Sequence, residues 1–284
     1  FSFFSLSEDK YMVTIVDAPG HANLIRSVVA CANIIDLALV VVDAEKGPQV
    51  QTGEHLMILH SMGIKDIIFV VNKIDLVQDL AIKKTIESLK SLISGLDFKV
   101  HDFIPVSAKE RKGIEQLKDS MTRFFDTHPE KIKRNLDGPF LFLFDHYFLI
   151  KGKGTILTGN TLRGNAKIGD SITILPENIE TKIKSLQRHK EATETTQAGD
   201  RVGIAVSNVD PEQVSRGSFA VSNPKDYKPT NMVEGQVRVS GYFKYDIPFG
   251  SEITINSGMQ VFQAKIYPYS PEENKRFPKD IKIT

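Results

Sequence analysis

The sequence of 284 residues contains a single cysteine, Cys31, and no tryptophan. One cysteine cannot build an internal disulfide framework, and this composition is typical of a reducing, cytoplasmic environment. The longest apolar run, residues 37–42, is far shorter than the ~18 residues that a membrane-spanning helix requires, so we expect no membrane partner. The chain starts with Phe1-Ser2-Phe3-Phe4, without an initiator methionine or a basic targeting region, which indicates a fragment that begins inside a strand.

The chain also lacks an excess of either charge, because it contains 36 Lys+Arg and 35 Asp+Glu residues, which give a net charge of +1. This balance excludes a generally basic coat for nucleic acid, although it leaves room for a local basic patch. With 41% hydrophobic and 25% charged residues, the chain can bury substantial cores, and its length favours two or three domains.

The first 125 residues alternate short apolar runs with segments of helical periodicity. Strands are predicted at residues 12–17, 37–43, 67–72 and 103–106, and helices at residues 23–33, 51–61, 80–92 and 114–125. A strand that is apolar throughout, such as residues 67–71, is expected in a parallel sheet that helices cover on both faces. The pattern therefore predicts a doubly wound α/β domain over residues 1–127.

The pattern of apolar residues changes after a polar linker predicted at residues 128–138. Short strands separated by Gly-Asp and Gly-Asn turns are predicted at residues 140–144, 154–158, 171–175, 182–186 and 202–206. They indicate an antiparallel β-barrel of Greek-key type over residues 139–223. A second all-β stretch, residues 228–284, has predicted strands at 233–239, 252–255 and 260–266 and is interpreted as part of a further barrel.

The first predicted strand ends in Asp17-Ala18-Pro19-Gly20-His21. An aspartate at a strand tip can hold Mg²⁺ through water, and a glycine three residues later can bring its backbone N–H against a terminal phosphate. A D-x-x-G pattern by itself is far more often an ordinary turn.

A second motif, Asn72-Lys73-Ile74-Asp75, follows the strand at residues 67–71. The carboxylate of Asp75 can accept the N1–H and the N2 amine of guanine, and the stem of Lys73 can lie over the base. Adenine offers neither donor, so its binding would leave the carboxylate unpaired at a cost of ~1–3 kcal/mol. The side chain of Asn72 can tie neighbouring loops together. Taken alone, the motif fits a polar strand end before a helix cap equally well.

A third motif, Ser107-Ala108-Lys109, follows the strand at residues 103–106. In a guanine site, the N–H of Ala108 would donate a hydrogen bond to O6 of the base. Adenine has an amine at this position, which is a donor and could not accept that hydrogen bond. This tripeptide alone is little evidence. Three such motifs in this order, each after an apolar strand, indicate a nucleotide-binding ancestry.

The three loops resemble three of the five signature loops of the EF-Tu-type translational GTPases. The Asp-Ala-Pro-Gly-His form, with a helix and then Gln-Val-Gln-Thr-Gly-Glu-His at residues 49–55, is similar to the elongation-factor branch. Residues 145–155 and 199–203 most resemble the selenocysteine-specific elongation factors, SelB or EFSec, of archaeal and eukaryotic type. That family has a G domain, two β-barrels and a further C-terminal domain, which the 284 residues are not expected to include.

This resemblance implies a factor that binds GTP and delivers selenocysteinyl-tRNA to the ribosome at recoded UGA codons, with GTP hydrolysis on decoding. His21 would position the attacking water, while Asp17 and Gly20 would sense the γ-phosphate and its Mg²⁺. A selenocysteine-insertion RNA element, read directly or through another protein, is a further expected partner. The factor is expected to act as a monomer.

The resemblance also implies an aminoacyl pocket between the G domain and the first barrel, lined by Asp145, His146 and Arg201. A selenol is much more acidic than a serine hydroxyl, so the aminoacyl group is an anion near neutral pH. Arg201 and a protonated His146 would favour that anion. Asp145 would either accept from the α-amino group or orient His146. Without the resemblance, all three residues would be assigned to a solvated surface.

The remaining histidines carry no predicted function, and no Cys/His spacing suggests a zinc site. We interpret these histidines as surface or core residues: His55, His60, His101, His128 and His189. One predicted β segment is basic enough to supply part of a tRNA contact, or equally to be a solvated edge, with Lys182, Lys184, Arg188 and Lys190.

The sequence departs from the family in its phosphate-binding parts. G-x-x-x-x-G-K-[ST] does not occur in the 284 residues, since the only Gly-Lys pair, Gly152-Lys153, is followed by Gly154. The first switch segment is also missing. A partial reading frame or a truncated paralogue that only binds tRNA or protein would explain this. A separate alternative concerns the kind of factor: the protein could resemble the γ subunit of initiation factor two, which carries initiator tRNA. Charge at Asp145-His146 argues against the apolar pocket that a methionyl group would need.

Because the phosphate loop supplies most of the nucleotide affinity in such proteins, we expect these 284 residues to bind GTP very poorly and not to hydrolyse it. Titration with a fluorescent guanine nucleotide in the presence of Mg²⁺ measures this. Tight, Mg²⁺-dependent binding would contradict the expectation.

Overall fold

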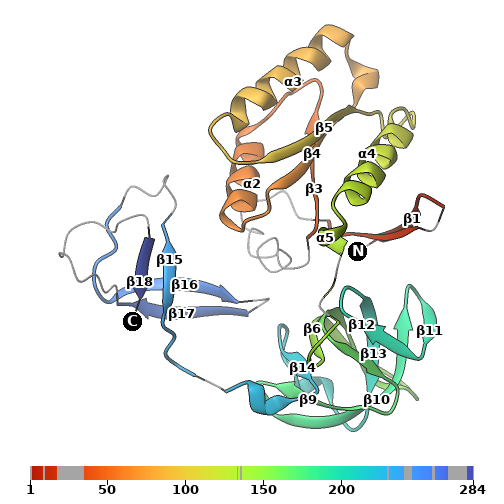
Figure 1. The fold of residues 1–284 in the computed structure, drawn as a ribbon, viewed down its shortest axis with the longest axis vertical. Helices are drawn as coiled ribbons and strands as arrows, with labels where there is room; N and C mark the ends of the chain where they lie inside the picture. The colour runs from red at the N-terminus through yellow and green to blue at the C-terminus, as the bar shows by residue number, and fades with distance from the viewer. Residues whose placement is uncertain are drawn as a thin grey trace.

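The computed structural model describes residues 2–8, 10–17, 35–132, 134, 136–228, 230–239, 245–257, 260–267 and 280–283. An α/β part lies above a β-barrel in Figure 1, and two β-ribbons from the C-terminal third lie to the side. The helix predicted at residues 23–33, together with Gly20, His21 and Cys31, lies outside the described residues.

A parallel sheet forms the centre of the α/β part. Its strands are β3 (Ala38–Asp43), β4 (Asp66–Asn72) and β5 (Lys99–Pro105), in the order β3-β4-β5. Alternate side chains of β4 enter different cores: Ile67, Phe69 and Val71 lie in one, and Ile68 and Val70 lie in the other. The sheet is therefore buried on both faces, as the uninterrupted apolar run predicts.

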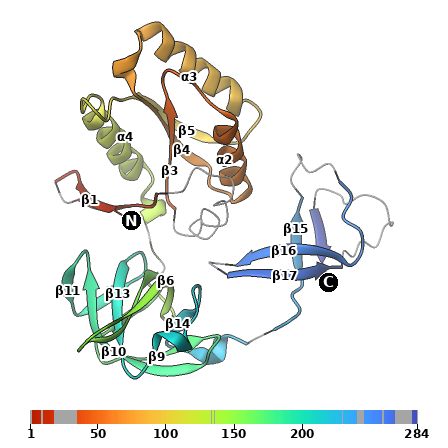
Figure 2. The same cartoon turned by 180° about the vertical axis from the view of Figure 1, so that it is seen from behind.

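Helices cover both faces of this sheet (Figures 1 and 2). On one face, α2 (Val50–Ser61) and α3 (Asp79–Ile93) contribute Leu56, Leu59 and Leu89 to the core. On the other face, α4 (Ile114–Thr127) contributes Met121, Phe124 and Phe125. The prediction of a doubly wound α/β arrangement is thereby confirmed. Two short helices complete the part: η3 (Ile74–Leu76) and, within the predicted linker, α5 (Pro129–Ile132).

The strand predicted at residues 12–17 differs from the expectation. It forms β2 (Tyr11–Ile15) and pairs antiparallel with β1 (Ser2–Leu6) in a two-stranded sheet separate from the parallel sheet. A tight turn joins the two strands, with the N–H of Lys10 donating to the carbonyl of Ser7 at 3.0 Å. Side chains of both strands pack on the core beneath α4, so local pairing and that core together replace the expected parallel pairing.

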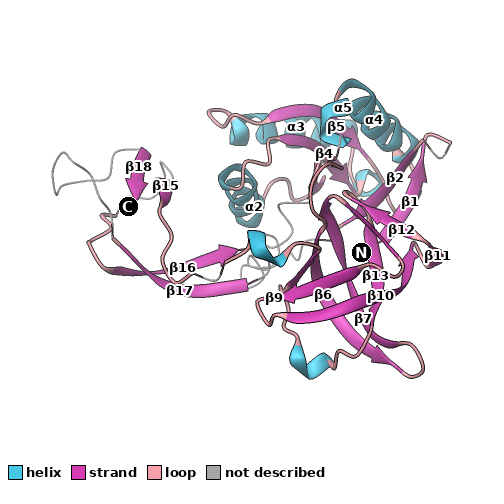
Figure 3. Ribbon diagram, turned by 60° about the horizontal axis from the view of Figure 1, so that its bottom comes forward, coloured by secondary structure: helices cyan, strands magenta, loops and turns pink. Residues whose placement is uncertain are grey.

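The second part of the chain is a closed six-strand antiparallel barrel (Figure 3), as predicted from its turns. Around the barrel the order is β10-β13-β7-β6-β14-β9, and pairing of β9 with β10 closes it. These strands are β6 (Leu141–Ile150), β7 (Gly154–Arg163), β9 (Ser171–Leu175), β10 (Ile179–Arg188), β13 (Arg201–Val206) and β14 (Phe219–Val221). Shorter elements decorate it: β8 (Asn165–Lys167), β11 (Glu191–Thr193), β12 (Thr195–Gln197), η4 (Pro211–Gln213) and η5 (Pro224–Asp226).

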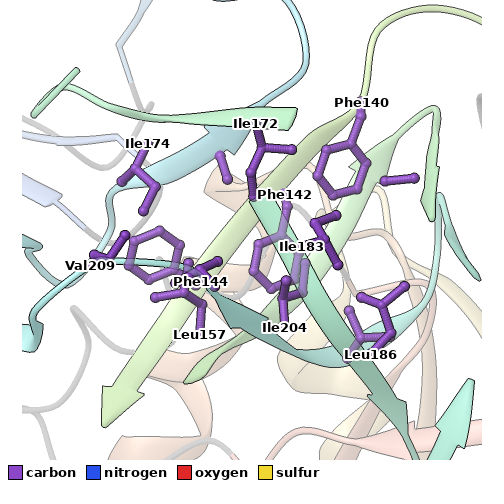
Figure 4. Close-up of a cluster of buried hydrophobic side chains, with 14 of the residues drawn as sticks. Phe140, Phe142, Phe144, Leu157, Ile172, Ile174, Ile183, Leu186, Ile204 and Val209 are labelled. Carbon is purple, nitrogen blue, oxygen red and sulfur yellow. The ribbon is translucent and has the colours of Figure 1, made fainter. Parts of the chain in front are cut away.

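Phenylalanines at alternate positions fill the barrel (Figure 4). Phe140, Phe142 and Phe144 are almost fully buried, and successive ring centroids lie 6.2 and 6.3 Å apart. Because side chains alternate across a strand, residues 141 and 143 point away from this core. Branched aliphatic residues from the opposite wall complete it, among them Ile172, Ile174, Ile183, Leu186 and Ile204.

Described residues beyond the barrel form two antiparallel pairs. In one, β15 (Gly235–Arg238) pairs with β18 (Asp280–Ile283), and in the other, β16 (Ser251–Ser257) pairs with β17 (Gln260–Ile266). All three strands predicted in this stretch are present, with shifted ends for β15 and β16. Among the helices that the structure describes, none has the length and apolar character needed to cross a bilayer.

The linker residue Arg134 joins the α/β part to the barrel. Its guanidinium donates to both carboxylate oxygens of Asp36, at 2.8 and 2.5 Å, and this pairing raises the pKa of Arg134. Its side chain also lies against Gly199 of the barrel, where an added Cβ would come within 2.8 Å of it. One arginine therefore contacts Asp36, two residues before β3, and a turn of the barrel.

We expect Arg134→Met to weaken this junction, because the variant keeps an aliphatic stem but loses both hydrogen bonds to Asp36. A double-mutant cycle with Asp36→Asn should give a coupling energy of about 1 kcal/mol in urea unfolding, the upper range for a partly exposed pair. Chymotryptic cleavage near Leu136, which is exposed, should also become faster.

Arg123→Met provides the matched control, since it removes an arginine paired with Asp102 inside the α/β part. It should leave cleavage in the linker unchanged. Equal cleavage rates for Arg134→Met and the unaltered chain would contradict the role of Arg134.

Candidate functional site

Two loops meet at the edge of the sheet where β4 and β5 end. The amide oxygen of Asn72, the last residue of β4, accepts from the N–H of Lys73 at 2.7 Å and from the N–H of Ala108 at 3.1 Å. A further bond joins the N–H of Ile74 to the carbonyl of Val106 at 3.2 Å. The side chain of Asn72 therefore links the loop after β4 to the loop after β5.

Asp75 is held by the second loop. The hydroxyl of Ser107, which is fully buried, donates to Oδ1 of Asp75 at 2.5 Å. This hydrogen bond lowers the pKa of Asp75, and the positive charges of Lys109 and Lys112 add to the effect. The carboxylate is consequently an anionic acceptor at the sheet edge, as recognition of the N1–H and N2 amine of guanine requires.

The loop after β5 closes tightly on itself. Ser107 and Lys112 exchange backbone hydrogen bonds of 3.0 and 3.1 Å, and Gly113 follows with a φ of +75°. A Cβ at Gly113 would lie 2.2 Å from the carbonyl oxygen of Pro105, so the close approach requires glycine. Ala108 lies in this turn, and its N–H donates to the side chain of Asn72. To bind Ala108, guanine O6 would have to share this donor or replace Asn72 as its acceptor.

Asp43 is a site residue that the sequence analysis missed. Lys73 has a left-handed backbone conformation, with φ of 66° and ψ of 35°, and its Nζ lies 2.8 Å from Oδ2 of Asp43. The other oxygen of Asp43 accepts from the N–H groups of Glu45 and Lys46. Asp43 thus anchors the cationic end of Lys73, leaving the stem extended between the ends of two strands. Because Asp43 pairs in register with Asn72 across adjacent parallel strands, its position at the strand end was the available signal.

Asp17, the residue predicted to hold Mg²⁺ through water, is exposed two residues after β2. Gly20 and His21 lie outside the described residues, so their roles remain predictions. Lys109 is exposed beside the loop after β5.

A second charged cluster lies on the barrel. Asp145, in β6, has a side chain only 2% exposed, and Nη2 of Arg201, at the start of β13, lies 3.0 and 2.8 Å from its two oxygens. Nδ1 of His146 lies 2.9 Å from Oδ1 of the same carboxylate. Asp145 therefore binds both other side chains that were predicted to line the pocket, the guanidinium of Arg201 and the imidazole of His146.

A β-bulge creates this cluster. Phe144 pairs with Gly159 and His146 with Thr158, so Asp145 is the extra residue of β6. A Cβ at Gly159 would lie 2.1 Å from the carbonyl oxygen of Leu143, which explains the glycine. The bulge directs Asp145 inward while the side chain of His146 remains 63% exposed.

The contacts of Asp145 bear on the two roles considered for it, both of which stay predictions. Since Arg201 engages both carboxylate oxygens and His146 engages one, the arrangement favours an orienting role over acceptance from an α-amino group. Arg201 is 16% exposed and His146 is mostly exposed, so the carboxylate holds one guanidinium and one imidazole near the surface.

The turn that carries Arg201 adjoins the domain junction. Gly199, under the side chain of Arg134, precedes Arg201 by two residues. Asp200 lies between them and forms an ion pair with Arg188 at 2.9 Å, so the guanidinium of Arg188 is bound within the barrel. Lys182, Lys184 and Lys190 of the predicted basic segment are exposed.

Comparison with known proteins gives matches along the chain. Residues 1–127 match the family described as the elongation factor Tu GTP binding domain, and residues 154–220 match elongation factor Tu domain 2. A selenocysteine-specific elongation factor of Methanocaldococcus jannaschii is 40% identical over 272 residues, which are 95% of this chain and 57% of that protein. The protein of the same name in Mus musculus is 32% identical over 276 residues, which are 93% of this chain and 47% of that protein.

Solved structures share the fold. The crystal structure of translation elongation factor SelB from Methanococcus maripaludis, in complex with the GTP analogue GppNHp, matches with a TM-score of 0.86 and 38% identity. The match covers 100% of this chain and 62% of that one. The chain therefore spans about half the length of the curated relatives and somewhat more of this structure.

We expect Asp43→Asn to destabilise the protein at neutral pH. Hydrogen bonding from Lys73, opposed by burial, lowers the pKa of Asp43 to about 2. A folded-state pKa below the unfolded value of about 3.9 gives stability that is present above that value and is lost as the pH falls toward 2. Urea unfolding should therefore show a difference between the variant and the unaltered chain at about pH 7 that shrinks near pH 2.5.

Asp119→Asn, on the exposed surface of α4, is the matched control and should show little difference at either pH. A stability difference for Asp43→Asn that is independent of pH would rule out the ion pair with Lys73 as its cause.

Proposed function

Because the chain belongs to the EF-Tu-type translational GTPases and is similar to selenocysteine-specific elongation factors over 95% of its length, we propose that it acts in the delivery of selenocysteinyl-tRNA. The protein would bind GTP, bring this tRNA to the ribosome at recoded UGA codons in the cytoplasm, and hydrolyse GTP on decoding. A selenocysteine-insertion RNA element would direct it, and it would act as a monomer. The similarity along nearly the whole chain is the observation that carries the proposal.

In this function, the loops after β4 and β5 would read the base. Asp75 would accept the two guanine donors, with Ser107 holding its carboxylate in place. Lys73, anchored by Asp43, would lay its stem on the base, and Asn72 would keep the loops together. These residues fit guanine because an anionic acceptor and a backbone donor converge on one sheet edge. Residues 1–127 would form the partial G domain, 128–138 the linker, 139–223 the first barrel and 228–284 part of a second.

Mg²⁺ and the γ-phosphate would lie near the end of β2. Asp17 is exposed there and could hold the ion through water, while Gly20 and His21 would respectively sense the phosphate and position the attacking water. Mg²⁺ would neutralise charge on the phosphate oxygens when bound.

The cluster on the barrel would select the aminoacyl group. Arg201 and His146, both held by Asp145, present cationic character at the surface next to the domain junction. A selenolate would gain charge-assisted hydrogen bonds there, whereas a seryl hydroxyl would gain less and leave the cations partly desolvated. A methionyl group would need apolar walls, so this cluster disfavours the initiation-factor alternative.

The test measures competition among aminoacyl-tRNAs on the native, full-length protein. Labelled selenocysteinyl-tRNA should be displaced far less readily by seryl-tRNA or initiator tRNA than by itself. Arg201→Met should reduce the preference for selenocysteinyl-tRNA over seryl-tRNA by about 10- to 100-fold, the range for one lost hydrogen bond to a charged group.

The control variant is Arg163→Met, which removes a partly buried arginine of the same barrel that donates to Tyr227. It should keep the preference. Equal affinity for the three tRNAs would refute the proposed cargo, and tight binding of initiator tRNA alone would support the initiation-factor alternative. Failure to bind any tRNA, with guanine nucleotide still bound, would point to a different role for the barrel.

A further inference from the structure

Three potential metal ligands converge at the end of the sheet opposite the guanine loops. Asp66 is the first residue of β4, His101 lies in β5, and His128 directly follows α4. A carboxylate oxygen and one ring nitrogen from each histidine lie within 4.8 Å of one another. Because β4 carries the guanine loop at its other end, about 20 Å away, this cluster is separate from the nucleotide site.

The local fold explains why these side chains meet. The β4–β5 register pairs Ile67 with Val100 and Ile68 with Asp102, so His101 is an extra residue in a bulge. Its ring packs on Phe124 with centroids 4.7 Å apart and on His128 with centroids 5.0 Å apart. The helix end and the bulge thus bring two imidazoles to a carboxylate that is 2% exposed.

Contacts at the two rings bear on which nitrogen can bind a metal. Nδ1 of His128 lies 3.0 Å from the carbonyl oxygen of Phe124 and 2.9 Å from Oγ1 of Thr127, and both oxygens can accept a hydrogen bond from it. In the tautomer that donates to the carbonyl, the lone pair of His128 is on Nε2, and these contacts orient the ring as they do in many metal-bound histidines. Nε2 of His101 lies 2.9 Å from Oδ1 of Asp66.

A cation already lies against this carboxylate. Nζ of Lys131 is 2.5 Å from Oδ2 of Asp66. Lys131 belongs to α5, a helix of four residues, and its side chain is 37% exposed. Its ammonium can therefore move into solvent without disturbing the core, and the position that it leaves remains beside a buried anion.

We propose that Asp66, His101 and His128 form a binding site for Zn²⁺, with Lys131 as the internal cation that the metal displaces. Two imidazoles and one carboxylate suit Zn²⁺ better than Mg²⁺ or Ca²⁺, which prefer oxygen ligands, and water would complete a tetrahedral shell. Zinc ligands at 2.0–2.2 Å stand roughly 3.3–3.5 Å apart, so no pair of donor atoms has to close by more than about 1.5 Å. His101 would bind through Nε2 once the proton on that atom moves to Nδ1 or to solvent.

Zinc at this position would fasten the end of α4 and the start of the linker to the sheet. Lys131 is only three residues from Arg134, which bonds to Asp36 and lies against Gly199. The metal would therefore act structurally, by restricting the segment that leads to the domain junction.

The experiment titrates the metal-free 284-residue chain with ZnCl₂ by calorimetry and with CoCl₂ by visible absorption. We expect one saturable site per chain, a rise in Tm with zinc, and the strong visible bands of tetrahedral Co²⁺. His128→Ala and His101→Gln should each abolish that saturable site.

Lys131→Met separates displacement of the ammonium from loss of folding, because it should bind zinc more tightly. The expected gain is on the order of tenfold, since the ammonium both repels the ion and occupies a ligand oxygen. A misfolded variant could not show tighter binding with the same stoichiometry.

The chain provides a control in His60, Asp97 and Lys65, a more exposed cluster that has one histidine, one aspartate and one lysine but lacks the second histidine of the proposed site. Nε2 of His60 lies 2.8 Å from Asp97, and Lys65 bonds to the other oxygen of that carboxylate. His60→Ala should leave zinc binding unchanged. Loss of binding in His60→Ala, retention in both His101→Gln and His128→Ala, or weaker binding in Lys131→Met would each overturn the proposal, without bearing on tRNA delivery.

Discussion

Burial of β4 on both faces is the constraint on which the α/β part depends. Ile67 to Val71 are at most 4% exposed, so every side chain in the strand interior packs against a helix or a neighbouring strand. Such a strand can present polar groups only at its ends. Its last residue, Asn72, links the loops of the candidate guanine site, and its first residue, Asp66, anchors the histidine cluster. The same hydrophobic element thus separates two polar sites and holds each in place.

Carboxylates that are buried or partly buried organise the polar sites in a common way. Asp43, Asp66 and Asp145 each sit near or within a strand and each bind a cationic side chain together with a second donor. Burial of an unpaired carboxylate would be costly, so each acid is stabilised only in the presence of its partners. The partners are fixed in return. In the proposed function, Lys73 and Arg201 owe their positions to acids that need not touch nucleotide or aminoacyl group.

The junction between the two main parts gives these sites a physical connection. Arg134 bonds to Asp36, two residues before β3, and lies against Gly199, two residues from Arg201. Arg134 therefore places the residues that lead into β3 beside the turn that carries Arg201.

Periodicity in the sequence was sufficient for much of the fold. The helices α2, α3 and α4 and the strands β3, β4, β9 and β17 lie where apolar spacing predicts them, because each depends mainly on local pattern and burial. The strand β5 begins four residues before the predicted start at residue 103, in a stretch that includes Lys99, His101 and Asp102. The pairing of β2 with β1 was not predictable in this way, since an apolar strand can join either a parallel sheet or a local ribbon. The guanine motifs were visible because their residues are contiguous, whereas Asp43 reaches Lys73 only across neighbouring strands.

The same distinction separates the two charged clusters. The family resemblance suggested that Asp145, His146 and Arg201 lie together, but only the structure shows that the bulge in β6 turns Asp145 inward to bind the other two. Asp66, His101 and His128 come from three elements with no ligand spacing between them, and the sequence alone suggested no metal site. By itself, the sequence predicted most of the described elements and the contiguous loops of the candidate site, because both follow from local patterns. Only the tertiary structure decided which side chains that are distant in the sequence form ion pairs, because contacts between strand ends, bulges and helix ends depend on packing.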